Sequence, residues 1–415
     1  MMLGRDVMSF KRTPSHQKYV NKKRIIQCIQ ACSPISRAEI AVKLQLSKPT
    51  VSQAVDELIQ EKWVFEKGIG ESSSQGGRRP IQLFFNEKAA YIIGVDIGGT
   101  KVKIVLSDLS GNILADTSFS TNTYLNSGLL KQMAIETERL IAKNQIAKER
   151  ILGMGVGIPG ITQTASGLVI EAPSLGWVQY PFIAEAKRYF DFPIFLDNDV
   201  NAAALGEQWL GNAQNKRNLL FIAVGTGIGS GIILNNQLYR GASSAAGEMG
   251  YMVTDKEDIK REFKPIFHRY GYLESVAGGK SIGGHFTREV LKDPHHFLFE
   301  RAKSSELSGE DAFFAAKKGD TAAMAVINEA IEHLACGIVN AASLLNPEVI
   351  ILGGGVLNSA EYILPIIREI VDRYLPSLVE MKTSQLGENA GVLGAVSLFL
   401  REYDGILNFR DEGEY

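Results

Sequence analysis

The chain has 415 residues, of which 45% are hydrophobic and 22% are charged, a composition typical of ordinary globular proteins. At about 100–200 residues per domain, this length suits about two to four folded units. The three cysteines, Cys28, Cys32 and Cys336, argue against a disulfide framework and indicate a reducing compartment.

The net charge of −2 hides an uneven distribution along the chain. Residues 1–88 hold 15 Lys and Arg against 8 Asp and Glu, whereas the remaining residues hold 29 against 38. A basic N-terminal block indicates a nucleic-acid-binding module, although a solvated basic face would have the same composition. The chain opens without the apolar core of a signal peptide, and its most apolar stretch, residues 219–234, is interrupted by glycines. We therefore expect a cytoplasmic protein with no membrane partner.

Three helices are predicted in the N-terminal block. Residues 18–31 place three isoleucines on one helical face. In the SRAE segment that follows, Ser36 and Glu39 form a capping box that opens a second, short helix. Ser47 is the N-cap of a third helix, with Pro49 in its first turn, where the missing N–H costs nothing. Two short helices joined by a tight link form a helix-turn-helix pattern.

The third helix is the one expected to enter the major groove of DNA with its N-terminal polar residues. Ser47, Lys48 and Thr50 are predicted to contact phosphates, and Ser52 and Gln53 to contact base edges.

A hairpin wing is predicted after these helices. Residues 63–66 and 81–85 have the composition of strands, and the loop between them is rich in Gly and Ser. Arg78 and Arg79 lie near its tip and could enter a narrow, A·T-rich minor groove. The alternative is an ordinary solvated loop, but the charge and the helical motif together favour DNA contact.

The body opens with a glycine-rich turn between two strands. Residues 91–97 form an apolar strand, Gly98, Gly99 and Thr100 follow, and residues 102–106 alternate as a second strand. Because no helix follows the glycines, the pattern excludes a P-loop and a Rossmann fingerprint. Such a hairpin can still present backbone N–H groups to a phosphate, and Asp96 just before it could hold Mg²⁺ through water.

Two further glycine-rich turns follow, at 225–231 and 353–355, each after an apolar strand. Two strand–turn–strand hairpins in one chain suggest a duplicated core with a nucleotide cleft between two lobes. Between them, a strand ends at Asp197, Asn198 and Asp199, and a helix follows. A carboxylate at such a strand end can act as a general base toward a hydroxyl, although one of these residues could only cap the helix.

Together these segments resemble the ROK family (repressors, open reading frames, kinases) over essentially the whole chain. The resemblance implies an α/β architecture: an N-terminal winged helix-turn-helix plus a two-lobed ROK body of the actin/hexokinase type. The motifs that carry it are VDIGGTK at 95–101, GIPG at 157–160, DNDVNAAALGE at 197–207, VGTGIGSGI at 224–232, RGASSAAGEMGYM at 240–252 and ILGGGV at 351–356.

The resemblance also implies roles for single residues. Asp199 matches the base that takes the proton from the sugar hydroxyl, and Asn198, Glu248 and Glu274 match ligands of sugar hydroxyls. The implied chemistry is in-line phosphoryl transfer from ATP with Mg²⁺, if activity survives. The residues that match the nucleotide cradle are Asp96, Gly98, Gly99, Thr100, Gly225, Thr226, Gly227 and Gly354.

The sequence departs from the family at its structural zinc site. The family often holds zinc with one His and three Cys, and the aligned positions here are Tyr251, Pro265, Phe267 and Tyr272. Because a tetrahedral zinc site needs thiolate or imidazole donors, we predict no zinc and a small apolar cluster in its place. Tyr251 keeps a hydroxyl, so a sugar could still bind there with altered preference. Ser174 also stands where the family usually has Asn.

Two functions fit these patterns. The first is a regulator, most simply a repressor, that binds operator DNA as a homodimer or tetramer and responds to a sugar or sugar phosphate. The second is an ATP-dependent sugar kinase with an accessory DNA-binding arm. In a kinase the glycine motifs bind the nucleotide, whereas the alternative is that they are only turns that the fold requires. The expected domains are residues 1–88 for DNA binding, 89–200 with a helix at 386–405 as a small lobe, and 201–385 as a large lobe.

Overall fold

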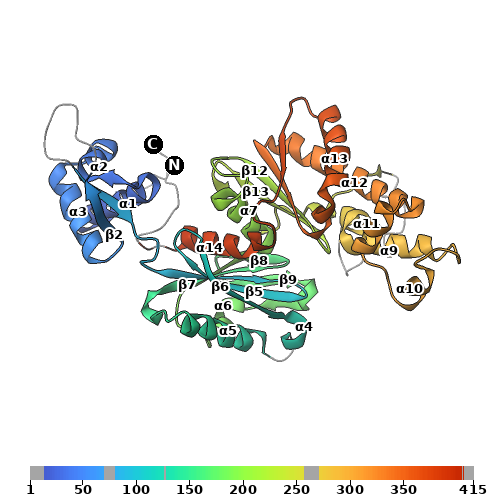
Figure 1. Ribbon diagram of the computed structural model, residues 1–415, viewed down its shortest axis with the longest axis horizontal. Helices are drawn as coiled ribbons and strands as arrows, with labels where there is room; N and C mark the ends of the chain where they lie inside the picture. Colours follow the sequence, from blue (N-terminus) through green and yellow to red (C-terminus); the bar gives the residue numbers. More distant parts are fainter. Residues whose placement is uncertain (1–13, 70–79, 126–127, 257–270, 404, 406–415) are drawn as a thin grey trace, which may run out of the picture. The chain divides into compact units, whose positions relative to one another are not determined.

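The protein forms two compact units, which are described separately (Figure 1). Unit 1 comprises residues 1–91, 108–112 and 400–415, and unit 2 comprises residues 92–107 and 113–399. The computed structural model describes residues 14–69, 80–125, 128–256, 271–403 and 405.

Unit 1 is a winged helix-turn-helix, as the sequence predicts. Three helices pack beside a three-stranded sheet of order β1-β3-β2. Its elements are α1 (Pro14–Cys32), β1 (Ile35–Ser36), α2 (Arg37–Leu44), α3 (Lys48–Gln60), β2 (Val64–Ile69) and β3 (Ile81–Phe85).

Local signals in the sequence set the helix ends of unit 1. The Ser36 side chain accepts a hydrogen bond from the Glu39 N–H, and the Glu39 carboxylate accepts one from the Ser36 N–H at 2.8 Å, which confirms the capping box. The link to α3 passes through Gln45 in the left-handed conformation, at φ 53°. Ser47 caps α3 as predicted. The three isoleucines of α1 at 25, 26 and 29 are fully buried, so the helical face predicted for this segment is its core face.

Unit 2 is built on two five-stranded sheets with the same topology. In each sheet the strand that comes first in the chain is the central one. The second and third strands follow on one side of it, and the fourth and fifth on the other. This repetition is the duplicated core that the two glycine-rich hairpins predict. The first sheet, β11-β7-β4-β5-β6, comprises Ile194–Asn198, Ile151–Ile158, Tyr91–Ile97, Lys101–Asp108 and Ile113–Ser120; the second, β14-β13-β12-β15-β16, comprises Gln237–Leu238, Ile228–Leu234, Leu219–Val224, Val349–Gly353 and Glu380–Thr383.

Helices cover both sheets, and a small third sheet, β10-β9-β8, joins Trp177–Tyr180, Leu168–Ala172 and Ile161–Gln163. Figure 1 shows α5 on one face of the first sheet and α14 on the other. The helices of unit 2 are α4 (Thr121–Tyr124), α5 (Leu129–Lys143), α6 (Phe182–Ala186), α7 (Asp199–Leu210), α8 (Tyr272–Ala277), α9 (Gly279–Val290), α10 (Phe299–Ser304), α11 (Gly309–Lys317), α12 (Thr321–Leu345), α13 (Ala360–Tyr374) and α14 (Ala390–Glu402).

Small residues let α14 approach the first sheet and α7 closely. A Cβ added to Gly94 on β4 or to Gly155 on β7 would collide with the backbone of α14. A Cβ on Gly206 of α7 would lie 3.0 Å from the backbone nitrogen of Gly394 on α14. Any side chain at these positions would push α14 away, since close-packed backbone cannot yield as a flexible side chain can.

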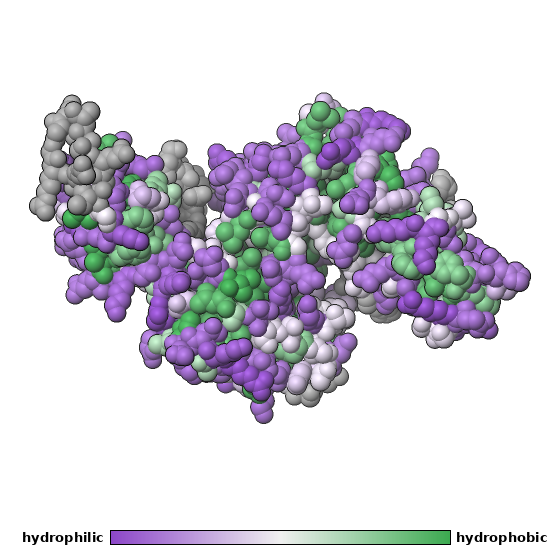
Figure 2. Space-filling view, in the orientation of Figure 1, coloured by the Kyte–Doolittle hydropathy of each residue, from purple (hydrophilic) through white to green (hydrophobic). Residues whose placement is uncertain are grey.

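The helix α12 is the one described helix that is long and apolar enough to cross a membrane by length and composition. Its residues Ile327, Ile331, Leu334 and Ile338 are buried in the core beside the second sheet. Figure 2 shows a mainly hydrophilic visible surface, as expected when most apolar side chains are gathered inside.

Candidate functional site

The start of α3 carries the residues predicted to contact DNA. Lys48 and Gln53 are exposed, and Ser52 is half-buried, so no core packing depends on the tip of either Lys48 or Gln53. The hydroxyls of Ser47 and Thr50 lie 2.8 Å apart, and Ser47 Oγ accepts from the Thr50 N–H at 3.3 Å. These two hydroxyls therefore take part in capping the helix, and a bound DNA phosphate would contact hydroxyls that also form the cap. Arg78 and Arg79 of the predicted wing lie outside the described residues.

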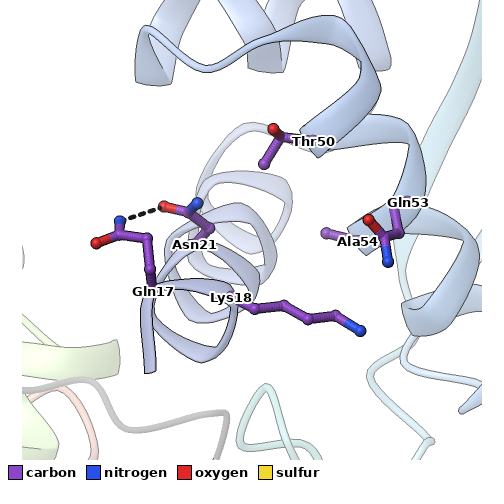
Figure 3. Close-up of a pocket in the computed structure, with 6 residues that line it drawn as sticks. All are labelled: Gln17, Lys18, Asn21, Thr50, Gln53 and Ala54. Atoms are coloured by element: carbon purple, nitrogen blue, oxygen red, sulfur yellow. Dashed lines mark hydrogen bonds between the residues drawn. The ribbon is translucent and has the colours of Figure 1, made fainter. Parts of the chain in front are cut away.

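A polar pocket of about 330 Å³ lies between α1 and α3. Figure 3 shows Gln17, Lys18 and Asn21 on α1 facing Thr50 and Gln53 on α3. Sequence reasoning missed the three α1 residues. Their spacing of one and four positions places them on one helical face, but the sequence does not indicate which helix that face meets.

A chain of contacts links α1 to Gln53, which the sequence predicts to contact base edges. Lys18 Nζ lies 2.6 Å from Glu57 Oε1. Hydrogen bonds from Lys18 and, more weakly, from Gln53 lower the pKa of Glu57. Lys22 Nζ also lies 2.6 Å from Glu61 Oε1. Glu57 on α3 and Glu61 at its C-terminal end are thus paired with lysines of α1, and Asp56 of α3 is paired with Arg37, which reduces their repulsion of a DNA phosphate.

In unit 2 the glycine turns lie where the sequence predicts. Gly98 N–H donates to the Lys101 carbonyl at 2.9 Å, and Gly225 N–H donates to the Gly227 carbonyl at 2.9 Å, so both turns are closed hairpins. Gly354 has φ 90°, a conformation that a side chain would strain. The exposed Thr100 and Thr226 sit at the hairpin tips with their hydroxyls accessible.

A pocket of about 740 Å³ gathers two of the three turns. Gly225 and Thr226 line it, together with the segment after Gly354 and the start of α9. Its volume lies within the range of small-molecule sites, which is about 300–1,000 Å³. The structure places Asp96 and residues 98–100 outside the lining of this pocket. They lie on the β4–β5 hairpin, where Ser174 approaches Gly99: a Cβ on Gly99 would be 3.2 Å from the Ser174 Cβ.

The structure brings the predicted sugar-side carboxylates together. Burial and the Asp199 charge raise the pKa of Glu248 to about 7, with Glu274 adding to the effect. Burial raises the pKa of Asp199 to about 6. Burial, followed by Asp199, raises the pKa of Asp96 to about 7, against the opposite effect of Lys103. Buried carboxylates whose pKa values are raised, with Glu248 coupled to Asp199 and Glu274 and Asp96 coupled to Asp199, are a candidate functional site rather than a structural ion-pair network.

Glu274 has an incomplete hydrogen-bond set. Its residue is only 4% exposed, and its Oε2 accepts from the Ile228 N–H at 3.0 Å. Its Oε1 is buried and has no hydrogen-bond partner among the residues that the structure describes. A buried acceptor of this kind is costly unless a ligand satisfies it, and a sugar hydroxyl is a suitable donor.

Asn198 is the residue of the acidic cluster that caps α7. Its Oδ1 accepts from the Val200 and Asn201 N–H groups at 2.9 and 3.0 Å, and its Nδ2 donates to the Gly160 carbonyl at 2.9 Å. The capping alternative is therefore confirmed for Asn198. Asp199 follows as the first residue of α7, and its charge raises the pKa of both Glu248 and Asp96.

Two of the four positions that replace the zinc ligands are adjacent in space. A Cβ on Gly271 would collide with the Tyr251 backbone, so Tyr251 abuts the start of α8, where Tyr272 lies. Tyr251 itself is 47% exposed. Pro265 and Phe267 lie outside the described residues, within which no group of three or more His, Cys, Asp or Glu could hold a metal.

Among the described residues, Tyr272 packs against a polar side chain, and the small apolar cluster stays a prediction because Pro265 and Phe267 lie outside them. The Tyr272 ring meets His333 of α12 edge to face, with centroids 5.7 Å apart. His333 Nδ1 in turn lies 2.6 Å from Thr254 Oγ1. A hydrogen bond thus links residue 254 to α12, and an aromatic contact links α12 to α8.

We predict that a zinc chelator leaves the thermal unfolding midpoint unchanged, whereas His333→Ala lowers the free energy of unfolding by about 1–3 kcal/mol. The loss combines one hydrogen bond with one aromatic pair. Calorimetry on the full chain measures it, and the exposed His295→Ala serves as the matched control. Stoichiometric zinc in the purified protein would contradict the prediction.

Comparisons with known proteins match two separate parts of the chain to two families. Residues 20–64 match winged helix-turn-helix DNA-binding domains, and residues 92–402 match the ROK family. The xylose repressor of Caldicellulosiruptor bescii is 31% identical over 390 residues, which cover 93% of this chain and 96% of the repressor.

Solved structures extend the likeness to the fold. A ROK family transcriptional regulator, a homologue of the E. coli MLC protein, has a TM-score of 0.77 at 27% identity, covering 94% of this chain and 98% of its own. A ROK family glucokinase from Streptomyces griseus, solved with glucose and AMPPNP, has a TM-score of 0.62 at 27% identity, covering 74% of this chain and 99% of its own. The repressor and the regulator thus span nearly the whole chain, whereas the glucokinase spans about three quarters of it.

Proposed function

Because this chain belongs to the ROK family, we propose that it is a sugar-responsive DNA-binding regulator that represses genes of carbohydrate metabolism. The observation that carries the proposal is the joining of a winged helix-turn-helix, at residues 20–64, to a ROK body at residues 92–402. A sugar kinase needs only the body, whereas a repressor also needs a unit that binds operator DNA. The near full-length likeness to a xylose repressor supports the same function.

Residues 1–88 form the DNA-binding part of this proposal, with residues 89–200 plus the C-terminal helix and residues 201–385 as the two lobes of the body. Ser47, Lys48 and Thr50 contact phosphates, and Ser52 and Gln53 contact bases. The protein acts in the cytoplasm as a homodimer or tetramer, because two recognition helices reach two operator half-sites about one helical turn apart.

The effector is a sugar or sugar phosphate bound by the carboxylate cluster. Asp199, Glu248 and Glu274 accept hydrogen bonds from its hydroxyls, and Asn198 and Tyr251 complete the site. The unpartnered buried oxygen of Glu274 supports this assignment. For the sugar to change operator binding, it must bind the DNA-bound and free states with different affinities, and closure of the body around it is the proposed source of that difference.

A second candidate function, ATP-dependent sugar phosphorylation, is favoured by the state of Asp199. A carboxylate with a pKa of about 6 is suited to accept a proton from a sugar hydroxyl near neutral pH. The pocket beside Gly225 and Thr226 has room for a nucleotide, and the Asp96 carboxylate is a suitable oxygen ligand for Mg²⁺. ATP and Mg²⁺ would supply the phosphoryl group and the charge that stabilises its transfer.

Fluorescence anisotropy on the DNA upstream of this gene, with a panel of sugars and sugar phosphates, tests the proposal. The salt concentration is held fixed, because phosphate contacts make affinity strongly salt-dependent. Specific binding that one sugar weakens is the expected result, and it identifies the effector. Binding no tighter than to random DNA across the panel would overturn the regulator and make ATP turnover the next assay.

A further inference from the structure

A buried ion pair lies beside the sugar-side carboxylates but takes no part in the roles assigned above. Asp197, the residue before Asn198 on β11, is only 1% exposed. Its Oδ2 lies 2.6 Å from Arg240 Nε and accepts from Thr164 Oγ1 at 3.3 Å. Its Oδ1 accepts from the Asn198 N–H at 2.7 Å and from Asn201 Nδ2 at 2.9 Å. Both carboxylate oxygens are thus fully used.

This pair joins the two halves of the body. Asp197 belongs to the first five-stranded sheet, whereas Arg240 follows β14 of the second. The bond therefore connects the strand end that carries Asp199 to the segment that carries Glu248. Because a guanidinium presents several donors in a fixed plane, it sets the direction of this connection as well as its length.

The segment from Arg240 to Glu248 is held at its other end as well. The Gly247 carbonyl accepts from the Ser230 N–H at 2.8 Å and from Ser230 Oγ at 2.9 Å. Gly247 has φ 90°, and a Cβ there would collide with the Ser230 carbonyl, so the anchor requires glycine. The Ala246 N–H also donates to the Arg240 carbonyl at 3.1 Å, which closes the segment into a loop. The segment that ends at Glu248 is therefore held at both ends, at Arg240 by Asp197 and at Gly247 by Ser230.

Electrostatics gives the pair a second role. Asp199 and Glu274 already disfavour the charge of Glu248, and Asp199 disfavours that of Asp96. Arg240 is the cation that the structure places on the fifth carboxylate, Asp197. Without it, the buried Asp197, two residues from Asp199, would keep the hydrogen bonds from Thr164, the Asn198 N–H and Asn201 but would lose its counter-charge.

We propose that Arg240 is a positioning residue for the sugar site: through its ion pair with Asp197, it holds the Glu248 segment opposite Asp199. This inference rests on the proposed sugar-binding function. It implies that this bond, together with the packing of α7 on β13, sets the two halves of the site before any ligand arrives. Loss of the bond should then weaken sugar binding although no residue that contacts the sugar has been changed.

The test compares Arg240→Gln, Arg240→Lys and the surface control Arg288→Gln in the full chain. Calorimetric titration with the sugar identified by anisotropy measures affinity, and operator binding without sugar reports on the rest of the fold. We expect Arg240→Gln to weaken sugar binding about tenfold to a hundredfold, the range typical of lost orienting contacts. Arg240→Lys keeps the charge but not the planar guanidinium, so its sugar affinity should lie between those of Arg240→Gln and the wild type. Arg288→Gln should leave sugar affinity unchanged, and operator affinity without sugar should not change in any of the variants.

Hydrogen–deuterium exchange supplies a readout that needs no sugar. If Arg240→Gln proves unstable, Arg240→Lys should still raise exchange at residues 241–248 relative to wild type, with β13 unchanged. The double variant Asp197→Asn with Arg240→Gln removes the buried unpaired charge, so it should recover thermal stability but not sugar affinity.

Three results would overturn the inference. Wild-type sugar affinity in Arg240→Gln would show that the pair does not position the site. Full recovery of affinity in the double variant would show that only the unpaired charge mattered. Failure of the wild-type chain to bind any sugar would remove the proposed function and the inference together. This outcome differs from the first two because it is seen in the wild type, before any variant is compared.

Discussion

Replacing Ser52 and Gln53 together with alanine should weaken operator binding about a hundredfold or more while leaving sugar affinity unchanged. Each good base contact is worth about 1–3 kcal/mol of discrimination, and about 1.4 kcal/mol is a tenfold change in affinity. Gln53 is exposed and Ser52 half-buried, so neither substitution removes a core contact. The loss should therefore come from the interface and not from unfolding.

The shape of that loss separates base contacts from phosphate contacts. Anisotropy at several salt concentrations should show a large loss on the operator, a small loss on random DNA and an unchanged salt slope. Gln60→Ala is the matched control, because Gln60 is exposed on the same helix but at its far end. An equal loss on operator and random DNA would mean that Ser52 and Gln53 contact the backbone instead.

The features that the sequence predicts well are those set by neighbouring residues. The capping box of Ser36 and Glu39 and the cap at Ser47 depend on groups three positions apart, so their residue types suffice to identify them. The same kind of box, Ser308 with Asp311, opens α11. The glycine-rich hairpins were equally readable, because a tight turn between strands restricts which residues fit.

The parts of the sites that the sequence could not supply are pairings across long separations. With 44 Lys and Arg and 46 Asp and Glu in the chain, charge alone cannot single out Arg240 as the partner of Asp197. The contact between Tyr272 and His333 arises only because α8 packs on α12. The pocket formed by Lys18 and its neighbours on α1 likewise depends on how α1 lies against α3. Such contacts follow from tertiary packing, which no local pattern records.

Sugar affinity should fall about tenfold or more when the pH is lowered from about pH 8 to about pH 5.5. The pKa of Glu248 is about 7 and that of Asp199 is about 6, so both carboxylates become protonated in this interval. An ionised carboxylate offers two acceptor oxygens to sugar hydroxyls, and protonation converts one of them into a competing donor. Below its pKa, each required carboxylate reduces affinity about tenfold per pH unit.

The stability of the sugar-free protein should change in the opposite direction over the same interval. Burial raises the pKa values of Asp96, Asp199 and Glu248 above their unfolded values, so the folded state binds protons more readily than the unfolded chain. Stability therefore rises as pH falls through about 7 and 6, and the gain is complete once the pH is below the unfolded values near about 4. The gain is smaller than the sum for three separate groups, because the carboxylates titrate as a coupled set.

Calorimetric titration with the effector and thermal unfolding without it, both across this pH range, measure the two trends. Glu248→Gln should flatten the affinity profile near pH 7 and remove the Glu248 share of the stability profile there, which leaves the share of Asp96 near pH 7 and that of Asp199 near pH 6. Glu369→Gln, an exposed carboxylate on α13, should change neither profile. If affinity and stability fell together on acidification, general unfolding would explain the lost binding. Opposite slopes exclude that explanation, because a protein that becomes more stable while it binds less tightly must be losing the ligand contacts themselves.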